Sequence, residues 1–193
     1  MGATASTMLE LGTAIPAFRL RDLEGKAVTS NDFAQAKGVL VAFICPHCPY
    51  VRHVRTEFAR QAREYQQRGV SVIAINSNDV TAFPEDSPEG MRTEVEEVGY
   101  TFQYLYDDTQ EVAKAFRAAC TPDFFLFDGR QRLVYRGQFD DSRPNSAVPV
   151  TGKDLKAAVE ALLAGRPVPA DQKPSLGCNI KWVKGNEPDY FRS

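Results

Sequence analysis

The sequence predicts an α/β sandwich in which helices cover both faces of a central mixed sheet. A strand, a helix and a second strand follow one another over residues 38–76, the pattern of a parallel βαβ unit. Residues 123–128 and 132–137 form two more apolar strands, and the short turn GRQ between them requires antiparallel pairing. Parallel and antiparallel pairs in one chain predict a mixed sheet with helical layers.

Length and composition fit one domain, expected over residues 1–164, followed by an appendage over residues 165–193. The net charge of -2 argues against a nucleic-acid partner, which would favour a basic surface. No apolar run approaches the roughly 20 residues that cross a bilayer. The first residues have neither the basic nor the apolar part of a secretory signal. We therefore expect a cytoplasmic protein without a membrane partner.

The first half of the chain carries the clearest elements. Residues 38–44, GVLVAFI, form a continuous apolar run that indicates a buried strand of a parallel sheet. A helix follows, because apolar residues then recur at spacings of three and four: Val51, Val54, Phe58, Ala62 and Tyr65. Gly69 ends this helix, and residues 69–76, GVSVIAIN, indicate a second buried strand.

Capping residues mark the helices of the second half. Ser87, followed by a proline, indicates the start of one helix, and residues 104–106 fit a short strand. Asp108 and Glu111 have the spacing of a capping pair at the start of a short helix. The last helix follows a cap within residues 151–154, and its apolar stripe consists of Leu155, Ala158, Val159, Leu162 and Leu163.

The last 29 residues, 165–193, do not form a regular helix or strand pattern, because four prolines interrupt them. They nevertheless carry more apolar side chains than a solvated linker would: Leu176, Cys178, Ile180, Trp182, Tyr190 and Phe191. We therefore expect an ordered tail that packs back on the domain.

Cys45 and Cys48 form a C-x-x-C pair in the segment CPHCPY. In a reducing compartment such a pair more often serves redox chemistry or metal binding than structure. Cys48 lies where the helix begins, and a helix N-terminus stabilises the thiolate, which is the reactive form. Four nearby side chains, Arg52, Arg55, His47 and His53, are expected to add to this stabilisation.

Two other interpretations of this pair stay open. Two reduced cysteines can be buried as small apolar residues without reacting. Alternatively, the thiols and imidazoles of this segment are ligand types for zinc or copper: Cys45, His47, Cys48 and His53.

Thr121 and Pro122 come immediately before the strand DFFLFD. A peptide bond before proline can be cis, and a cis bond here would leave the backbone of Thr121 open to an extended substrate segment. The ordinary alternative is a trans proline that opens a strand.

These elements together resemble the thioredoxin superfamily: a strand, then CPHCPY at a helix start, then TPDFFLFD and a hairpin. Residues 15–33 are similar to the N-terminal hairpin of the peroxiredoxin-like branch, the alkyl-hydroperoxide-reductase and thiol-specific-antioxidant proteins. The segment PSLGCNIKW looks like the tail of an uncharacterised peroxiredoxin-like subfamily. The resemblance implies a thioredoxin-like sandwich with an N-terminal hairpin extension, and a cis Pro122 beside the active cysteine.

The resemblance also implies roles for the cysteines. The family's nucleophile lies five residues after the aromatic residue that ends the strand, and counting from Phe43 gives Cys48. The family's second cysteine would fall on Val51, so Cys45 is expected to resolve from the loop side. If the loop shifts this register, the two roles exchange.

The peroxidase pattern of the family fits less well. Its proline and threonine positions ahead of the reactive cysteine hold Val41 and Cys45 here, and no arginine precedes the third core strand. Peroxide reduction needs donors for the leaving oxygen, and only Arg117 or Arg136 is at hand. We therefore rank thiol-disulfide exchange above peroxidase activity, with a zinc- or copper-binding module as a third interpretation.

Two further thiols complete the expected site. Cys120 precedes Thr121 and is either a third redox thiol or a buried structural cysteine. Cys178 can resolve a sulfenate or mixed disulfide at Cys48 if the tail returns to the active face; otherwise it packs or pairs with Cys120. No organic cofactor is expected. The substrate would be a protein or small-molecule disulfide, or a peroxide, and the reductant a thioredoxin- or glutathione-type donor.

Overall fold

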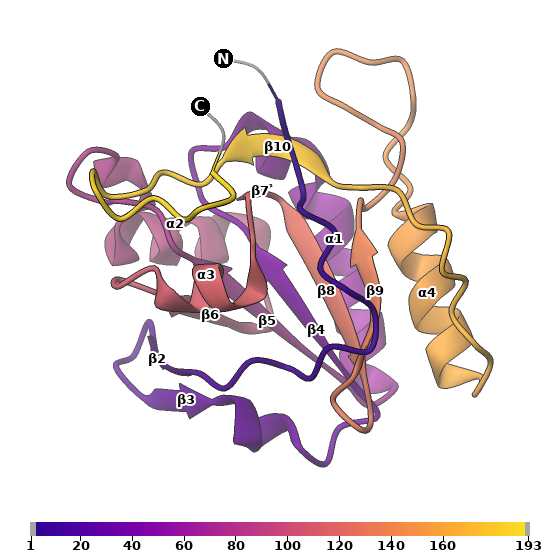
Figure 1. Ribbon diagram of the computed structural model, residues 1–193. Helices are drawn as coiled ribbons and strands as arrows, with labels where there is room; N and C mark the ends of the chain where they lie inside the picture. The colour runs from indigo at the N-terminus through magenta and orange to yellow at the C-terminus, as the bar shows by residue number, and fades with distance from the viewer. Residues whose placement is uncertain (1–2, 192–193) are drawn as a thin grey trace.

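The structure is a computed structural model that describes residues 3–191. A seven-stranded mixed sheet with the order β3-β2-β6-β5-β4-β8-β9 forms its centre (Figure 1). Its strands are β2 (Arg19–Asp22), β3 (Ala27–Thr29), β4 (Gly38–Phe43), β5 (Val70–Asn76), β6 (Gln103–Tyr106), β8 (Asp123–Asp128) and β9 (Leu133–Gly137). Strand β4 pairs parallel with β5 and antiparallel with β8, so the predicted mixed sheet is confirmed.

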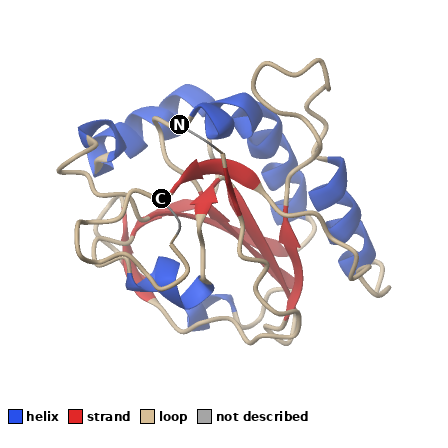
Figure 2. Cartoon of the chain, turned by 45° about the horizontal axis from the view of Figure 1, so that its top comes forward, coloured by secondary structure: helices blue, strands red, loops and turns tan. Residues whose placement is uncertain are grey.

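Helices lie on both sides of this sheet (Figure 2). The helices α1 (Pro49–Gln67), α2 (Pro88–Val98) and α4 (Lys153–Leu163) cover one face, and α3 (Glu111–Phe116) packs with the N-terminal segment on the other. Side chains of β4 alternate between the two faces, as the period of a strand requires. Leu40 packs toward α1, and Val41 and Phe43 pack toward α3.

Strands β2 and β3 form the expected N-terminal hairpin extension. They pair antiparallel, and Arg21 of β2 lies opposite Tyr106 of β6, so the hairpin extends the central sheet. The 3-10 turn η1 (Ser30–Phe33) then leads into β4. The thioredoxin-like sandwich with this extension is therefore confirmed.

One predicted helix start is wrong in its detail. The carboxylate of Asp107, not Asp108, caps α3, because it accepts hydrogen bonds from the backbone N–H groups of Val112 and Ala113 at 3.3 and 2.9 Å. Gln110 precedes the helix in the left-handed region, with φ at 64°, and this turn changes the spacing that the capping pattern assumes. The cap at Ser87 is confirmed, since its side chain accepts from Gly90 N–H.

The tail is ordered and forms a strand. Strand β10 (Leu176–Asn179) lies between β1 (Thr4–Ala5) and β7 (Cys120–Thr121) in a second, three-stranded sheet. Figure 1 shows this segment in yellow above the ends of the central strands. Ile180, directly after β10, is buried in the core on the α3 side. Within residues 3–191, no helix is both long and apolar enough to span a bilayer.

Candidate active site around Cys48

Cys48 occupies the N-cap of α1, because the chain leaves β4 at Phe43 and turns through the cysteine loop before Pro49. Proline suits the first helical position, where the missing N–H would have no partner. The Cys48 carbonyl accepts the first helical hydrogen bond, from the N–H of Arg52 at 3.0 Å. All four cysteines are free thiols, and Cys48 itself is fully buried.

Thr121 is contacted by the sulfurs of both Cys45 and Cys48. Its peptide bond to Pro122 is cis, as the resemblance implies. The Cys48 sulfur lies 3.2 Å from the Thr121 carbonyl oxygen, and the Cys45 sulfur lies 3.5 Å from the Thr121 hydroxyl. The structure therefore brings together the two cysteines of the C-x-x-C pair and the threonine-proline pair.

Cys48 has the lowest pKa of the three thiols gathered at the site. Hydrogen bonding from the Cys178 thiol, and then from the Cys45 thiol, lowers the pKa of Cys48 well below its ordinary range, although burial opposes this. The Cys48 thiol donates to the Thr121 carbonyl at 3.2 Å, a contact that favours its protonated form. The pKa values of Cys45 and Cys178 are raised, first of all by their hydrogen bonds to Cys48. Cys48 is thus the thiol of the site that loses its proton most readily.

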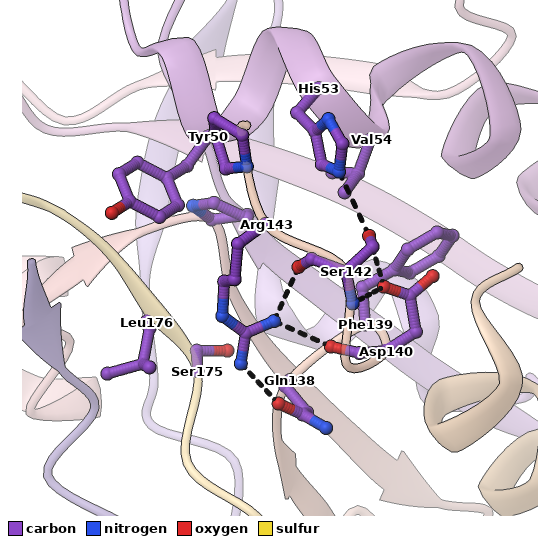
Figure 3. Close-up of a pocket in the computed structure, with 12 residues that line it drawn as sticks. Tyr50, His53, Val54, Gln138, Phe139, Asp140, Ser142, Arg143, Ser175 and Leu176 are labelled. Carbon is purple, nitrogen blue, oxygen red and sulfur yellow. Dashed lines mark hydrogen bonds between the residues drawn. The ribbon is translucent and has the colours of Figure 1, made fainter. Parts of the chain in front are cut away.

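The cations expected to stabilise this thiolate are engaged elsewhere. The Arg52 guanidinium donates to the Pro46 carbonyl at 2.8 Å and so orders the cysteine loop. Arg55 pairs with Glu94 at 3.5 Å and contacts a second glutamate. His53 bonds to the Ser142 hydroxyl at 3.0 Å, on the side of α1 shown in Figure 3. Arg52, Arg55 and His53, which were expected to add to the stabilisation of a Cys48 thiolate, therefore have other partners.

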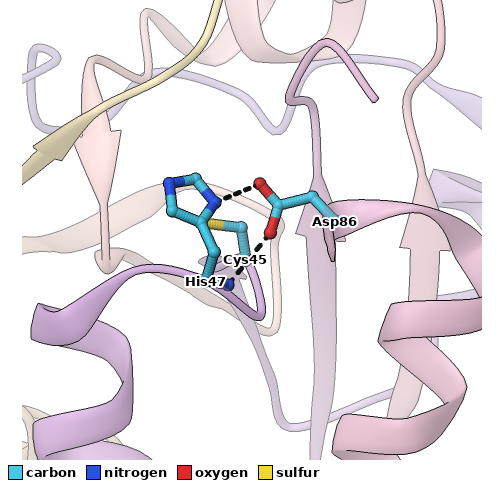
Figure 4. Close-up of side chains that lie close together, drawn as sticks. All are labelled: Cys45, His47 and Asp86. Atoms are coloured by element: carbon cyan, nitrogen blue, oxygen red, sulfur yellow. Dashed lines mark hydrogen bonds and ion pairs between the residues drawn. The ribbon is translucent and has the colours of Figure 1, made fainter. Parts of the chain in front are cut away.

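His47 and Asp86 form a pair beside Cys45 (Figure 4). The His47 Nδ1 atom lies 2.5 Å from an Asp86 carboxylate oxygen and 3.9 Å from the Cys45 sulfur. Asp86 is fully buried in the 3-10 turn η2 (Pro84–Asp86), where it also accepts from the Asn78 side chain at 2.8 Å. Its hydrogen bond raises the pKa of His47.

Sequence reasoning missed Asp86. The signal that was available is topological, because the loops after β4 and β5 leave adjacent parallel strands at the same edge of the sheet. The metal set expected from sequence is not assembled, since His53 turns to the Ser142 loop. Cys45, His47 and Asp86 instead place their ligand atoms within 4.8 Å of one another.

Strand β10 brings the tail cysteine to the site. Cys178 lies opposite Thr121 in the antiparallel register between β10 and β7, and Asn179 lies opposite Cys120. Neighbouring residues of a strand point to opposite faces, so Cys178 and Cys120 do not share a face. The Cys120 thiol instead approaches the Pro122 carbonyl at 3.7 Å, and burial raises its pKa well above its ordinary value. Cys120 is thus a poor candidate for a third reactive thiol.

The same register corrects one expectation about the substrate. The backbone of Thr121 was expected to be open to an extended substrate segment, but β10 of the chain itself pairs with it. The two candidate peroxide donors are also occupied. Arg117 stacks over the ring of Tyr190 at 4.7 Å, and the Arg136 Nε atom donates to the Leu9 carbonyl at 2.7 Å.

A cysteine of lowered pKa at a helix N-terminus, beside a cis-proline and two further cysteines, is typical of an oxidoreductase that works through cysteine chemistry on a thioredoxin-like fold. The AhpC/TSA family model matches residues 11–136, and the chain belongs to this family. Its relatives support an oxidoreductase activity of the thiol-disulfide class.

Three comparisons describe these relatives. An uncharacterized conserved protein from Geobacillus kaustophilus is 54% identical, with a TM-score of 0.92 over 95% of this chain and 97% of its own. The thiol-disulfide oxidoreductase ResA of Geobacillus thermodenitrificans is 26% identical over 161 residues, 82% of each chain. A thiol:disulfide interchange protein from Chlorobium tepidum TLS shares the fold, with 17% identity and a TM-score of 0.62 over 80% of this chain and 98% of its own.

Proposed function

We propose that the protein catalyses thiol-disulfide exchange and that Cys48 is the nucleophile that closes its internal disulfide. One observation carries this proposal: Cys48 is buried at the start of α1 with its sulfur 3.2 Å from the carbonyl of Thr121, and Thr121 pairs with Cys178 of β10. Cys45 and Cys178 both lie beside Thr121, as Cys48 does, and either is a candidate for the second cysteine of the disulfide. The exchange would take place in the cytoplasm, which cell fractionation would test.

The order of events follows from the hydrogen bonds. Cys45 and Cys178 remain protonated mainly because each donates to the Cys48 thiolate. When a proton passes to Cys48, its negative charge is lost, and the largest cause of the raised pKa values of the other two thiols disappears. The second thiol, now a thiolate, can attack the external disulfide, and Cys48, deprotonated again by the leaving thiolate, then closes the internal disulfide. Each cycle leaves one internal disulfide and two reduced external thiols, and a thioredoxin- or glutathione-type donor returns the two electrons.

Intact mass after incubation with a disulfide tests this proposal. The wild-type protein and the Cys120→Ser variant should each lose two hydrogens as the internal disulfide forms, and Cys48→Ser should not. Comparing Cys45→Ser with Cys178→Ser identifies the second thiol. An unchanged internal disulfide in Cys48→Ser would contradict the assignment of the nucleophile.

Peroxide reduction is the second candidate, because a thiolate of low pKa also attacks hydroperoxides. The same mass experiment with hydrogen peroxide distinguishes the two. A sulfenate on Cys48 and rapid loss of peroxide would favour the peroxidase. An inert thiolate would favour disulfide exchange.

A metal-binding module is the third candidate, favoured by the cluster of Cys45, His47 and Asp86. Thiolate, imidazole and carboxylate are all zinc ligands. Stoichiometric zinc or copper in the purified protein, lost in Asp86→Asn, would support this function. A metal-free protein that still forms its internal disulfide would reject it.

A further inference from the structure

Strand β10 occupies the position beside Thr121 and Pro122 that an extended substrate would need. On one edge, Cys178 and Asn179 pair with β7. On the other edge, Leu176 and Gly177 pair with β1. Because both edges of β10 are paired, another extended chain cannot add to this sheet next to the thiols.

The contact between β10 and the cis-proline is very close. A Cβ atom added to Gly177 would lie 2.0 Å from the Thr121 carbonyl oxygen, which no side chain can tolerate. The cavity that remains beside Pro122 and Leu176 (Figure 3) has a volume of about 20 Å³. That is room for about one water molecule. A substrate side chain therefore cannot enter between the tail and the cis-proline.

The tail is anchored on both sides of this contact. Before β10, the Ser175 hydroxyl donates to the Gly137 carbonyl at 2.6 Å. After β10, Ile180 N–H donates to the Ala119 carbonyl at 3.1 Å, and Lys181 N–H donates to the Asn78 side chain at 2.9 Å. These bonds distinguish β10 from a loose lid that opens for each substrate.

The four thiols differ in their access to solvent. Cys45, Cys48 and Cys120 are each 0% exposed, whereas Cys178 is partly exposed. We infer that Cys178 is the thiol that reacts directly with external disulfides and thiols of low molecular weight. Cys48 exchanges electrons with these substrates through Cys178. This inference rests on the proposed thiol-disulfide exchange. It names the class of substrate and the cysteine that reacts with it first.

The exchange balances in two steps. A proton passes from Cys178 to Cys48, and the Cys178 thiolate attacks a small disulfide RSSR, so that a Cys178–SR bond forms and RS⁻ leaves. The leaving thiolate takes the proton from Cys48. The Cys48 thiolate then attacks the Cys178 sulfur, which forms the Cys48–Cys178 disulfide and releases the second RS⁻. One external disulfide is reduced by two electrons, and the protein is oxidised by two; small thiols drive the reverse reaction.

The position of a trapped adduct shows which cysteine reacts first with the external disulfide. The probe is 2-hydroxyethyl disulfide, and peptide mapping locates the adduct. Cys48→Ser should accumulate the adduct on Cys178, because the thiolate that would displace it is absent. In Cys178→Ser, labelling of Cys48 should be at least tenfold slower than labelling of Cys178 in Cys48→Ser. Fast labelling of Cys48 in Cys178→Ser would overturn the inference.

The substrate class has its own test on the wild-type protein. The rate of internal disulfide formation is measured with 2-hydroxyethyl disulfide and with an extended peptide disulfide. Each rate is divided by the rate at which the same disulfide reacts with free glutathione. The small probe should react at least tenfold faster on this scale, and equal rates would overturn the inference. If neither probe forms an internal disulfide, while both react with glutathione, the proposed function itself fails.

Discussion

The carbonyl oxygen of Thr121 lies 3.2 Å from the sulfur of Cys48, and the backbone of the same residue pairs with Cys178. Thr121 thereby joins the cysteine loop to the tail, two segments that are far apart in the sequence. The arrangement makes the charge of Cys48 depend on the tail, and this dependence can be measured.

The Cys48 thiolate should persist into acid. Absorbance of the thiolate at 240 nm should be present at neutral pH, disappear only well below it, and be absent in Cys48→Ser. Because the pKa of Cys48 is lowered on folding, its contribution to stability is present above the unfolded pKa, about 8.5. It is lost as the pH falls through the folded pKa.

Removal of the Cys178 thiol should raise the pKa of Cys48, because hydrogen bonding from Cys178 is the largest cause of its low value. Cys178→Ala should therefore shift the 240 nm titration to higher pH. Cys178→Ser keeps a donor and should shift it less, and Cys120→Ser serves as the control. Equal titrations in wild type and Cys178→Ala would show that the tail does not hold the thiolate.

Asp86→Asn should lower the pKa of His47 and destabilise the fold by about 1–3 kcal/mol, because buried donors lose their acceptor. The raised pKa of His47 contributes stability below its ordinary value of about 6.5, and this contribution is lost as the pH rises through the folded pKa. The difference in the free energy of unfolding between the variant and the wild type should thus be largest in mild acid. NMR titration of His47 gives the pKa, with Glu85→Gln as the control.

Asp123 is a buried carboxylate whose two oxygens have no hydrogen-bond partner, and burial raises its pKa well above the ordinary value. Its stability contribution is full below about pH 3.9 and falls as the pH rises toward the folded pKa. Asp123→Asn should therefore stabilise the protein at pH 8, by about 1–3 kcal/mol, and have little effect at pH 4. Urea unfolding at both values measures this, with the exposed Asp171→Asn as the control; an effect that does not change with pH would reject a protonated Asp123.

Gly177→Ala should loosen β10, because its new methyl group meets the Thr121 backbone. Alkylation of Cys48 by iodoacetamide should become at least about tenfold faster, which corresponds to about 1.4 kcal/mol of lost anchoring. Lys184→Ala, at an exposed position of the same tail, is the control. Unchanged alkylation in Gly177→Ala would mean that β10 does not shield Cys48.

The sequence predicted the parts of the fold whose signals are local. The apolar run of β4, the spacing of α1 and the Ser87 cap each depend on a few consecutive residues, and all three are confirmed. Asp86 was missed because a single acidic residue in a loop has no periodicity that links it to Cys45. The order of the tail followed from its apolar residues. The pairing of the tail with Thr121 could not be predicted from the sequence. Gly177 is required there only because the Thr121 backbone lies against it, and that contact is visible only in the folded structure.

Strand β10 follows its partner β7 only after a long stretch of chain, and this order has a consequence for biosynthesis. The cysteine loop and β7 leave the ribosome well before residues 176–179 do, so the edge of Thr121 remains unpaired while the rest of the sandwich can already fold. During this interval, Cys48 lacks both the cover and the hydrogen-bond donor that the tail supplies. A nascent chain stalled before β10 would therefore present an open strand edge beside a cysteine whose redox properties differ from those of the finished enzyme. Translation of residues 176–179 completes the three-stranded sheet and brings the Cys178 thiol to the site.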